Sequence, residues 1–361
     1  MVARVKDRRR RTSGYSAAGH SAAGLSVAKP SVTGRMPHAL VVAFAVAVLI
    51  ATNAAVVAVI TVRAHPRATN WPDQSFTFWP ERRWSEVEAA IGTLPAAKRL
   101  TKSALGTIEY RGKAYPVHLL SFAARGPARP RVLLVGSIHG TEPAGGRALL
   151  ELAAAMAGDP SLLAEVAVDI VPIANPWGWV HGYRYTGNGE DINRDFASSR
   201  TQESVLLRGL MRDRGPYDLV MDLHESKKPG YFVYEYLPPG EGFGSTFTGL
   251  VEAGGERLED WYREWFWRAE DGVLRMPTAA LWWVRLARQL SLEHYARLHG
   301  TRHAYTVESP VDDELAAWLA EGWGGEVALW DGIALAAVSR PDLLSTGALP
   351  PLPLPATFPD Y

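Results

Sequence analysis

The 361-residue chain contains no cysteine. Disulfide bonds are therefore excluded, and any metal site must take its protein ligands from histidine, aspartate and glutamate. Ten histidines and 38 acidic residues are available for such a site. The hydrophobic fraction of 47% is ordinary for a globular protein, so the chain can build the core of one large α/β domain or two small ones.

Net charge is also absent, but the charges are unevenly distributed. Residues 1–37 hold one acidic residue, Asp7, against the basic residues Arg4, Lys6, Arg8, Arg9, Arg10, Arg11, Lys29 and Arg35. The rest of the chain is therefore net acidic, which argues against a nucleic-acid-binding protein. Residues 12–37 are rich in Ser, Ala and Gly without apolar periodicity, so we predict a basic, disordered tail over residues 1–37.

Charged residues are missing altogether from the largely apolar run between Ala39 and Val62. A helix rises about 1.5 Å per residue, so this run would span roughly 36 Å, enough to cross a bilayer. It is longer than the apolar core of a signal peptide, and no clear cleavage site follows it. We predict a transmembrane helix over residues 38–63, with the basic tail in the cytoplasm and the body outside. A buried helix of a soluble protein is the alternative for this apolar run. Translation that starts at Met36 instead of Met1 would remove the basic tail.

A linker, a short helix and a β-hairpin are predicted to follow this apolar run. Residues 64–79 are predicted to form a linker, and residues 84–94 a short helix. Residues 107–110 and 114–122 are predicted to form a β-hairpin. No internal repeat is visible in the sequence. We place the start of the folded body near residue 80, where the predicted linker ends.

A histidine and a glutamate follow the first buried strand. Residues 132–138 are mostly apolar and indicate a strand, and residues 143–156 are predicted to form a helix. His139 and Glu142 occupy the turn between the two elements. Ligands bind at the carboxyl ends of strands in open α/β sheets, so this pair can coordinate a zinc ion. The pair is a weak signal by itself, because short motifs arise by chance.

A later apolar strand, beginning at residue 218, ends in His224. Together with His139 and Glu142 it gives a His2Glu set that leaves one position open for water, which is typical of catalytic zinc. Asp222 lies two residues earlier and faces the same side of the strand. It either orients His224 from behind or forms an ion pair in the core.

A polar segment lies between these two strands. A strand at residues 166–174 leads into a predicted turn at residues 175–178, and Arg184, Asn193 and Arg194 follow. Arginine offers a rigid fork of donors that suits a carboxylate or a developing oxyanion. A surface loop held by ion pairs is the alternative for this segment taken alone.

The last predicted strand, residues 303–308, ends in Glu308, and Pro310 would stop its ladder. The other predicted elements are a strand at residues 231–236 and helices at residues 281–298, 312–319 and 326–338. The segments at residues 261–267 and 281–283 are dense in aromatics, which indicates either packing, a membrane-facing surface or a wall for a substrate. Residues 341–361 are predicted to be a Pro-rich tail.

These motifs together resemble a known family. The ordered set is His139-Gly-Thr-Glu142, Asn175-Pro-Trp-Gly178, Arg184, Asp191-Ile-Asn193-Arg194, Asp222-Leu-His224 and Thr306-Val-Glu308. It resembles zinc carboxypeptidases of the carboxypeptidase A type over residues 80–340, which we take as the catalytic domain. The resemblance implies an α/β/α sandwich around a mixed, mostly parallel eight-stranded sheet. It also implies one zinc ion per chain and a substrate with a free carboxylate.

The resemblance assigns roles residue by residue. It makes His139, Glu142 and His224 the zinc ligands and Glu308 the general base. It makes Arg184 the residue that stabilises the oxyanion. Asn193 and Arg194 match the pair that holds a substrate carboxylate. The residue types are chemically suited to these roles, because zinc activates water and a nearby carboxylate can move its proton.

Two other functions remain open at this point. The aspartoacylase and succinylglutamate desuccinylase branch of the family shares these motifs and cleaves small acylated amino acids. A membrane-anchored binding protein with a decayed enzyme fold is the alternative of another class. The family also uses a tyrosine that closes over the substrate; Tyr295 and Tyr305 are candidates, although no motif places it.

Overall fold

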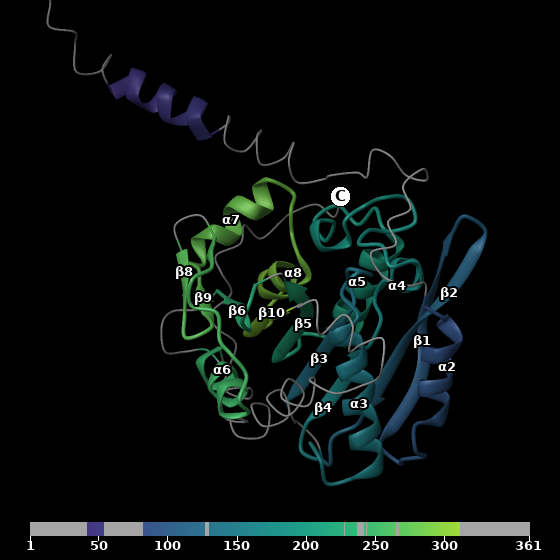
Figure 1. Cartoon of the computed structure of the whole chain (residues 1–361). Coiled ribbons are helices and arrows are strands. Elements are labelled where there is room, and N and C mark those ends of the chain that lie inside the picture. The colour runs from purple at the N-terminus through teal and green to yellow at the C-terminus, as the bar shows by residue number, and fades with distance from the viewer. Residues whose placement is uncertain are drawn as a thin grey trace, which may run out of the picture. The chain divides into compact units, whose positions relative to one another are not determined.

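The computed structural model describes residues 42–53, 82–126, 130–226, 228–236, 242, 244–264 and 267–310. Contacts divide the chain into two units, residues 1–51 and 52–361, and the sheet lies in the second unit (Figure 1). Several predicted segments lie outside the described residues: the tail at 1–37, the linker at 64–79, the helices at 312–319 and 326–338, and the tail at 341–361. These remain predictions.

The predicted transmembrane segment is described only over residues 42–53, which form a helix with mostly exposed side chains. Within the described part of the chain, no helix combines the length and the apolar character needed to cross a bilayer.

A mixed ten-stranded sheet forms the centre of the described body, in the order β1-β2-β4-β3-β5-β10-β6-β9-β8-β7 (Figure 1). The strands are β1 (Leu100–Tyr110), β2 (Lys113–Phe122), β3 (Arg131–Gly136), β4 (Ala167–Val171), β5 (Leu219–Ser226), β6 (Phe232–Glu235), β7 (Arg263–Glu264), β8 (Trp267–Glu270), β9 (Val273–Arg275) and β10 (His303–Pro310). The strands β4, β3, β5 and β10 run parallel at the centre. Of the other neighbours, only β6 and β9 pair in parallel.

The expected eight-stranded, mostly parallel sheet is therefore wrong in two respects. The described sheet has ten strands, and its flanks are largely antiparallel. The additional edge strands β7, β8 and β9 are two, four and three residues long. Such short strands are below the length at which a period of two can be recognised in a sequence.

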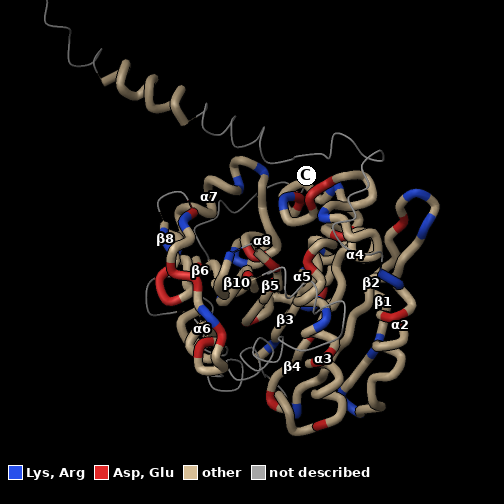
Figure 2. The backbone as a smooth tube through the Cα atoms, viewed as in Figure 1, with Lys and Arg blue, Asp and Glu red and all other residues tan. Residues whose placement is uncertain are grey.

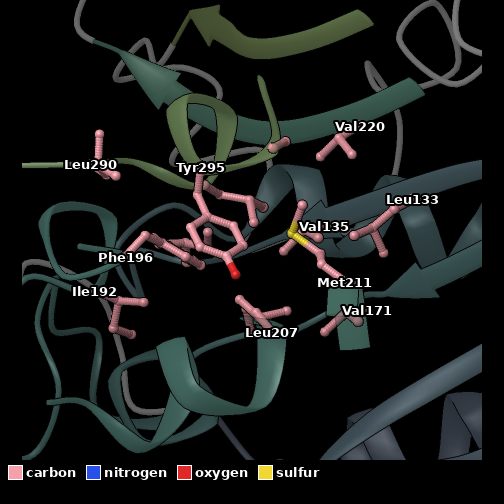
Figure 3. Close-up of a cluster of buried hydrophobic side chains, with 14 of the residues drawn as sticks. Leu133, Val135, Val171, Ile192, Phe196, Leu207, Met211, Val220, Leu290 and Tyr295 are labelled. Carbon is pink, nitrogen blue, oxygen red and sulfur yellow. The ribbon is translucent and has the colours of Figure 1, made fainter. Parts of the chain in front are cut away.

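Successive side chains of the central strands face two separate cores. On β3, Leu134 packs in one cluster while Leu133 and Val135 pack in the other, as the alternation of a strand requires. The first cluster includes residues of α2 (Trp84–Thr93), α3 (Ala144–Gly158) and α6 (Gly244–Ala253). The second includes residues of α5 (Gln202–Arg214), α7 (Ala279–Leu286) and α8 (Leu292–Leu298), and Figure 3 shows part of it. Helices thus cover both faces, and the predicted α/β/α sandwich is confirmed.

Two predicted local structures are wrong, and polar caps explain both. The predicted helix at residues 281–298 is split into α7 and α8, because the hydroxyl of Ser291 accepts a hydrogen bond from the His294 amide and starts a new helix. The predicted turn at residues 175–178 instead begins α4 (Pro176–His181), because the Asn175 side chain accepts a hydrogen bond from the Gly178 amide.

Positive and negative side chains are interspersed along the described chain, without a long run of either sign (Figure 2).

Candidate metal centre

Three neighbouring strands end at the centre and supply its polar side chains. β3 leads into the turn that carries His139 and Glu142, while β5 carries His224 and β10 carries Glu308. The parallel pairing of β5 and β10 places Glu308 directly opposite His224. The centre therefore lies where the carboxyl ends of the central parallel strands meet, the usual ligand position in an α/β sheet.

His139, Glu142 and His224 converge on one point. One potential ligand atom from each residue lies within 4.8 Å of those of the other two. Glu142 Oε2 is 3.0 Å from His139 Nδ1 and 2.7 Å from His224 Nδ1. All three residues are buried. The structure thus brings together the three predicted ligands in a donor set that fits a catalytic zinc ion.

Two aspartates hold the opposite nitrogens of the histidines. His139 Nε2 is 3.2 Å from Asp191 Oδ1, and His224 Nε2 is 2.8 Å from Asp222 Oδ2. Both imidazoles therefore present Nδ1 to the candidate metal position, and carboxylates behind metal-binding histidines fix ring orientation in this way. Asp222 thus takes the orienting position that the sequence left open. Asp191 was not predicted to have a role, because its only signal in the sequence was its place in the motif.

The Glu142 carboxyl group interacts strongly with the ionisable side chains around it. Burial raises the pKa of this carboxyl group, but the adjacent His139 and His224 outweigh burial and hold the pKa well below its usual value. Arg184 adds to this, since its Nη1 lies 2.9 Å from Glu142 Oε1 and its Nη2 lies 3.6 Å from Asp191 Oδ2. Arg184 therefore lies at the centre, paired with the two acidic groups, and also lines the adjoining cavity.

Glu308 is a carboxylate whose pKa is raised by its surroundings. Burial and the nearby Glu142 raise the pKa of Glu308 to about 7, while His224, His139 and Arg184 act in the opposite direction. A carboxylate whose pKa lies near the working pH can both accept and return a proton. Glu308 lies beside the candidate metal position and lines the same cavity.

A cavity of 630 Å³ opens from the centre. Its lining includes His139, Glu142, Arg184, Asn193, Arg194, His224, Glu225, Tyr234, Tyr236, Tyr262, Glu264, Trp267, Trp283, Glu293, His294, Thr306 and Glu308. The volume lies within the range of small-molecule sites. Its lining combines aromatic walls with five glutamates and two arginines. Trp267 and Trp283 belong to the aromatic-rich segments of the sequence, and their position supports a substrate wall.

The predicted carboxylate-binding pair is only partly available. Arg194 lines the cavity, where its Nη1 donates to the Asn193 carbonyl at 2.7 Å. The Asn193 side-chain oxygen already accepts a hydrogen bond from the Leu292 amide at 3.0 Å. Asn193 thus ties the 3-10 helix η1 (Ile192–Arg194) to α8, while the Arg194 side chain lines the cavity.

Neither tyrosine suggested from the sequence lies at the cavity. Tyr295 packs in the hydrophobic core (Figure 3), and the Tyr305 hydroxyl donates to Glu235 at 3.2 Å. Tyr234, Tyr236 and Tyr262 line the cavity instead. The period of two in the predicted strand at residues 231–236 could have paired Tyr234 with Tyr236, because residues i and i+2 share a face.

Comparisons with known proteins agree with this geometry. Residues 128–237 match the succinylglutamate desuccinylase/aspartoacylase catalytic domain. Carboxypeptidase 2 of Trichophyton rubrum is 30% identical over 123 residues, which are 32% of this chain and 23% of that protein. The chain thus aligns with about a quarter of that relative's length.

Solved structures show the same fold at low identity. A metallo-carboxypeptidase from Burkholderia cenocepacia has a TM-score of 0.52 at 20% identity, covering 73% of this chain and 69% of its own. A metallo-carboxypeptidase from Pseudomonas aeruginosa, in complex with (2-guanidinoethylmercapto)succinic acid, has a TM-score of 0.53 at 20% identity and covers 72% and 68%. The partial domain match, the partial sequence match and the shared fold together support a relationship to zinc carboxypeptidases and to the succinylglutamate desuccinylase and aspartoacylase branch.

Proposed function

We propose that this protein is a zinc-dependent metallocarboxypeptidase that hydrolyses a peptide bond next to a free carboxylate. The observation that carries the proposal is the convergence of His139, Glu142 and His224 beside Glu308, all of which line one cavity. A bound zinc ion would lower the pKa of water toward about 7 and polarise the scissile carbonyl. The names of the relatives support the same class of reaction.

The protein side chains have separate tasks in this reaction. Glu308 accepts a proton from the attacking water and passes it to the leaving amine, which suits a pKa of about 7. Arg184 supplies donors to the oxygen that becomes negative in the transition state. Arg194 holds the terminal carboxylate of the substrate, with Asn193 keeping the loop in place.

A deacylase acting on N-acyl amino acids is the second candidate function. It is favoured by the match of residues 128–237 to the desuccinylase and aspartoacylase domain. The same zinc ligands and the same Arg194 would serve an acylated amino acid, since both substrate classes carry a free carboxylate beside an amide.

One assay separates the candidate functions. The full chain, supplied with zinc, is given a mixed peptide library and, separately, N-acetyl and N-succinyl amino acids. Release of single residues from peptide C-termini is the expected result. Cleavage of the acylated amino acids alone would move the assignment to the deacylase, and no hydrolysis of either class would leave the binding-protein alternative.

Replacing Arg194 by alanine is expected to raise KM for peptides with a free terminal carboxylate by roughly 10- to 100-fold, because a charged hydrogen bond is lost. The measurement is steady-state kinetics on matched peptides with a free or an amidated C-terminus. Arg212→Ala is the matched control, since Arg212 lies on α5 with a largely exposed side chain. An unchanged KM for the free-carboxylate peptide would remove this role from Arg194.

Membrane anchoring through Ala39–Val62, with the N-terminus in the cytoplasm, is a proposal that rests on the sequence alone. Protease treatment of intact cells, followed by blotting for the body, provides the test. Degradation of the body is expected, with an intracellular protein as control. A body that remains protected until the cells are lysed would contradict the predicted topology.

A further inference from the structure

Arg82 is a half-buried cation just before α2, and it bridges two segments that lie far from it in the sequence. Its Nη1 donates to the Gly140 carbonyl at 2.9 Å and to the Trp179 carbonyl at 2.7 Å. Gly140 lies in the turn that carries His139 and Glu142, whereas Trp179 lies in α4. One nitrogen atom thus joins the metal-ligand turn to α4.

The metal-ligand turn and α4 lie in direct backbone contact. A Cβ atom on Gly140 would lie 2.0 Å from the Gly178 carbonyl carbon, much closer than real Cβ atoms approach other atoms. Only glycine fits at this position, because the two backbones leave no room for a side chain. The Gly140 amide also donates to the Arg184 carbonyl at 3.4 Å, in the segment that follows α4. A displacement of α4 would therefore displace the turn as well.

Three further contacts fix Arg82 and its surroundings on α4. The Arg82 amide donates to the Val180 carbonyl at 2.9 Å. The central carbon of its guanidinium group lies 5.3 Å from the centroid of the Trp179 ring, within the range of a cation–π contact. The Trp84 ring packs edge-on against the same indole, with 6.1 Å between the ring centroids. The guanidinium group therefore has a defined position from which it reaches Gly140.

The bonds from Arg82 to the two carbonyl groups are charge-assisted. Burial and the nearby Arg147 lower the pKa of Arg82 to about 10, while the charge of Glu225 acts in the opposite direction. Arg82 is therefore still a cation at neutral pH. Hydrogen bonds from a charged donor are stronger than those between neutral groups, so an apolar side chain at this position would weaken the link between the turn and α4.

The same two parts of the chain meet again at the metal ligands. Arg184 follows α4, and its Nη1 lies 2.9 Å from Glu142 Oε1. Within the turn, the Ser137 hydroxyl donates to the Glu142 carbonyl and the Glu142 amide donates to the His139 carbonyl, each at 3.0 Å. These bonds set the shape of the turn, whereas the bond from Arg82 sets its position against α4.

We propose that Arg82 is a positioning residue of the metal centre, which holds the turn of His139 and Glu142 against α4 so that both ligands meet His224 at one point. This inference rests on the zinc centre of the proposed function. Arg82 acts through the Gly140 backbone. It precedes residues 128–237, so it is not part of the match to the desuccinylase and aspartoacylase domain.

The test compares the zinc affinity of Arg82→Met with that of Arg83→Met. The Arg83 side chain is 81% exposed and pairs with Glu86 at 2.7 Å, so the neighbouring arginine provides a matched control. Affinity is measured by competition with a chromophoric chelator, at a temperature where every variant is folded. It should fall about 10- to 100-fold in Arg82→Met, as is typical when a residue that orients metal ligands is lost. Arg83→Met should stay within about threefold of wild type.

A purely structural role for Arg82 predicts a different result. Tm would fall in Arg82→Met while the zinc affinity stayed within about threefold of wild type, and this outcome would overturn the inference. Arg82→Lys should recover most of the affinity, because one ammonium nitrogen can replace the single Nη1 that makes both bonds. If Arg82→Met does not fold, Arg82→Gln replaces it under the same criterion, since its amide is too short to reach both carbonyl groups.

Hydrogen exchange keeps the inference separate from the proposed reaction. In zinc-free protein, the amides of residues 137–142 should exchange faster in Arg82→Met than in wild type, and at the wild-type rate in Arg83→Met. Wild type that binds no zinc would contradict the proposed function, and faster exchange in Arg82→Met would then still support the positioning of the turn by Arg82. Without zinc binding, equal exchange in all three proteins would overturn the inference.

Discussion

Glu308→Gln is expected to abolish turnover while the protein keeps its fold and its zinc. Glutamine has nearly the same shape but cannot accept the proton of the attacking water, so a loss of at least 10²–10⁴-fold in kcat is the expected size for a lost general base. KM should change little, because Glu308 acts in the transition state rather than in substrate binding. Steady-state kinetics together with elemental analysis of the same sample measure both quantities.

The position of Glu308 makes the control important. Glu308 lies opposite His224 in the strand pairing, so a disturbed metal site would also lower activity. Zinc content equal to that of wild type, with turnover lost, separates the two causes. A Glu308→Gln variant that binds zinc and retains more than about a tenth of wild-type kcat would be too active for the loss of a general base, and Glu308 would not have that role.

His139→Ala is expected to remove zinc binding and, with it, the stabilisation that zinc provides. At a free zinc concentration about 1,000 times the dissociation constant, binding stabilises the folded state by about 4 kcal/mol. For a domain of this size each kcal/mol corresponds to roughly 2–4 °C, so Tm should fall by about 8–16 °C. Differential scanning calorimetry with and without added zinc measures the effect.

Treatment with a chelator distinguishes the decrease in Tm caused by loss of the metal from the decrease caused by loss of the His139 side chain. His139 also contacts Asp191, so part of the decrease in Tm comes from that hydrogen bond. EDTA should lower the Tm of wild type toward that of the variant and leave the variant unchanged. A wild-type Tm that responds neither to zinc nor to EDTA would contradict zinc binding at this centre.

The sequence could bring the three candidate metal ligands together because the same local pattern occurs on β3, β5 and β10. In each case an apolar strand is followed by a polar side chain at its carboxyl end, and parallel strands bring these ends together. His139, His224 and Glu308 could therefore be placed near one another without coordinates. The spacing of His139 and Glu142 across one turn added the carboxylate ligand.

The surrounding residues were harder to find, because their roles depend on contacts between distant segments. Asp191 reaches His139 across 52 residues of sequence, and Glu293 reaches the cavity only because α8 begins at Ser291. The sequence pattern merged α7 and α8 into one helix, and in such a helix the side chain of Glu293 has no predictable partner. Periodicity places residues within an element and does not say which elements meet.

Some strands of the sheet could not be predicted from the sequence, because they are too short. The sandwich followed from the family resemblance, whereas the short strands β7, β8 and β9 carry too few residues to show a period. Tyr262 lies just before these strands, and it was therefore not recognised as part of the cavity wall.

The zinc content of the purified wild-type chain tests the central claim most directly. Elemental analysis of the folded protein, after exposure to zinc and removal of the excess, should give about one zinc ion per chain for the single His2Glu site. His224→Ala, measured beside it, should give none. Wild-type protein that is folded and binds no zinc would contradict the assignment of His139, Glu142 and His224 as the metal centre.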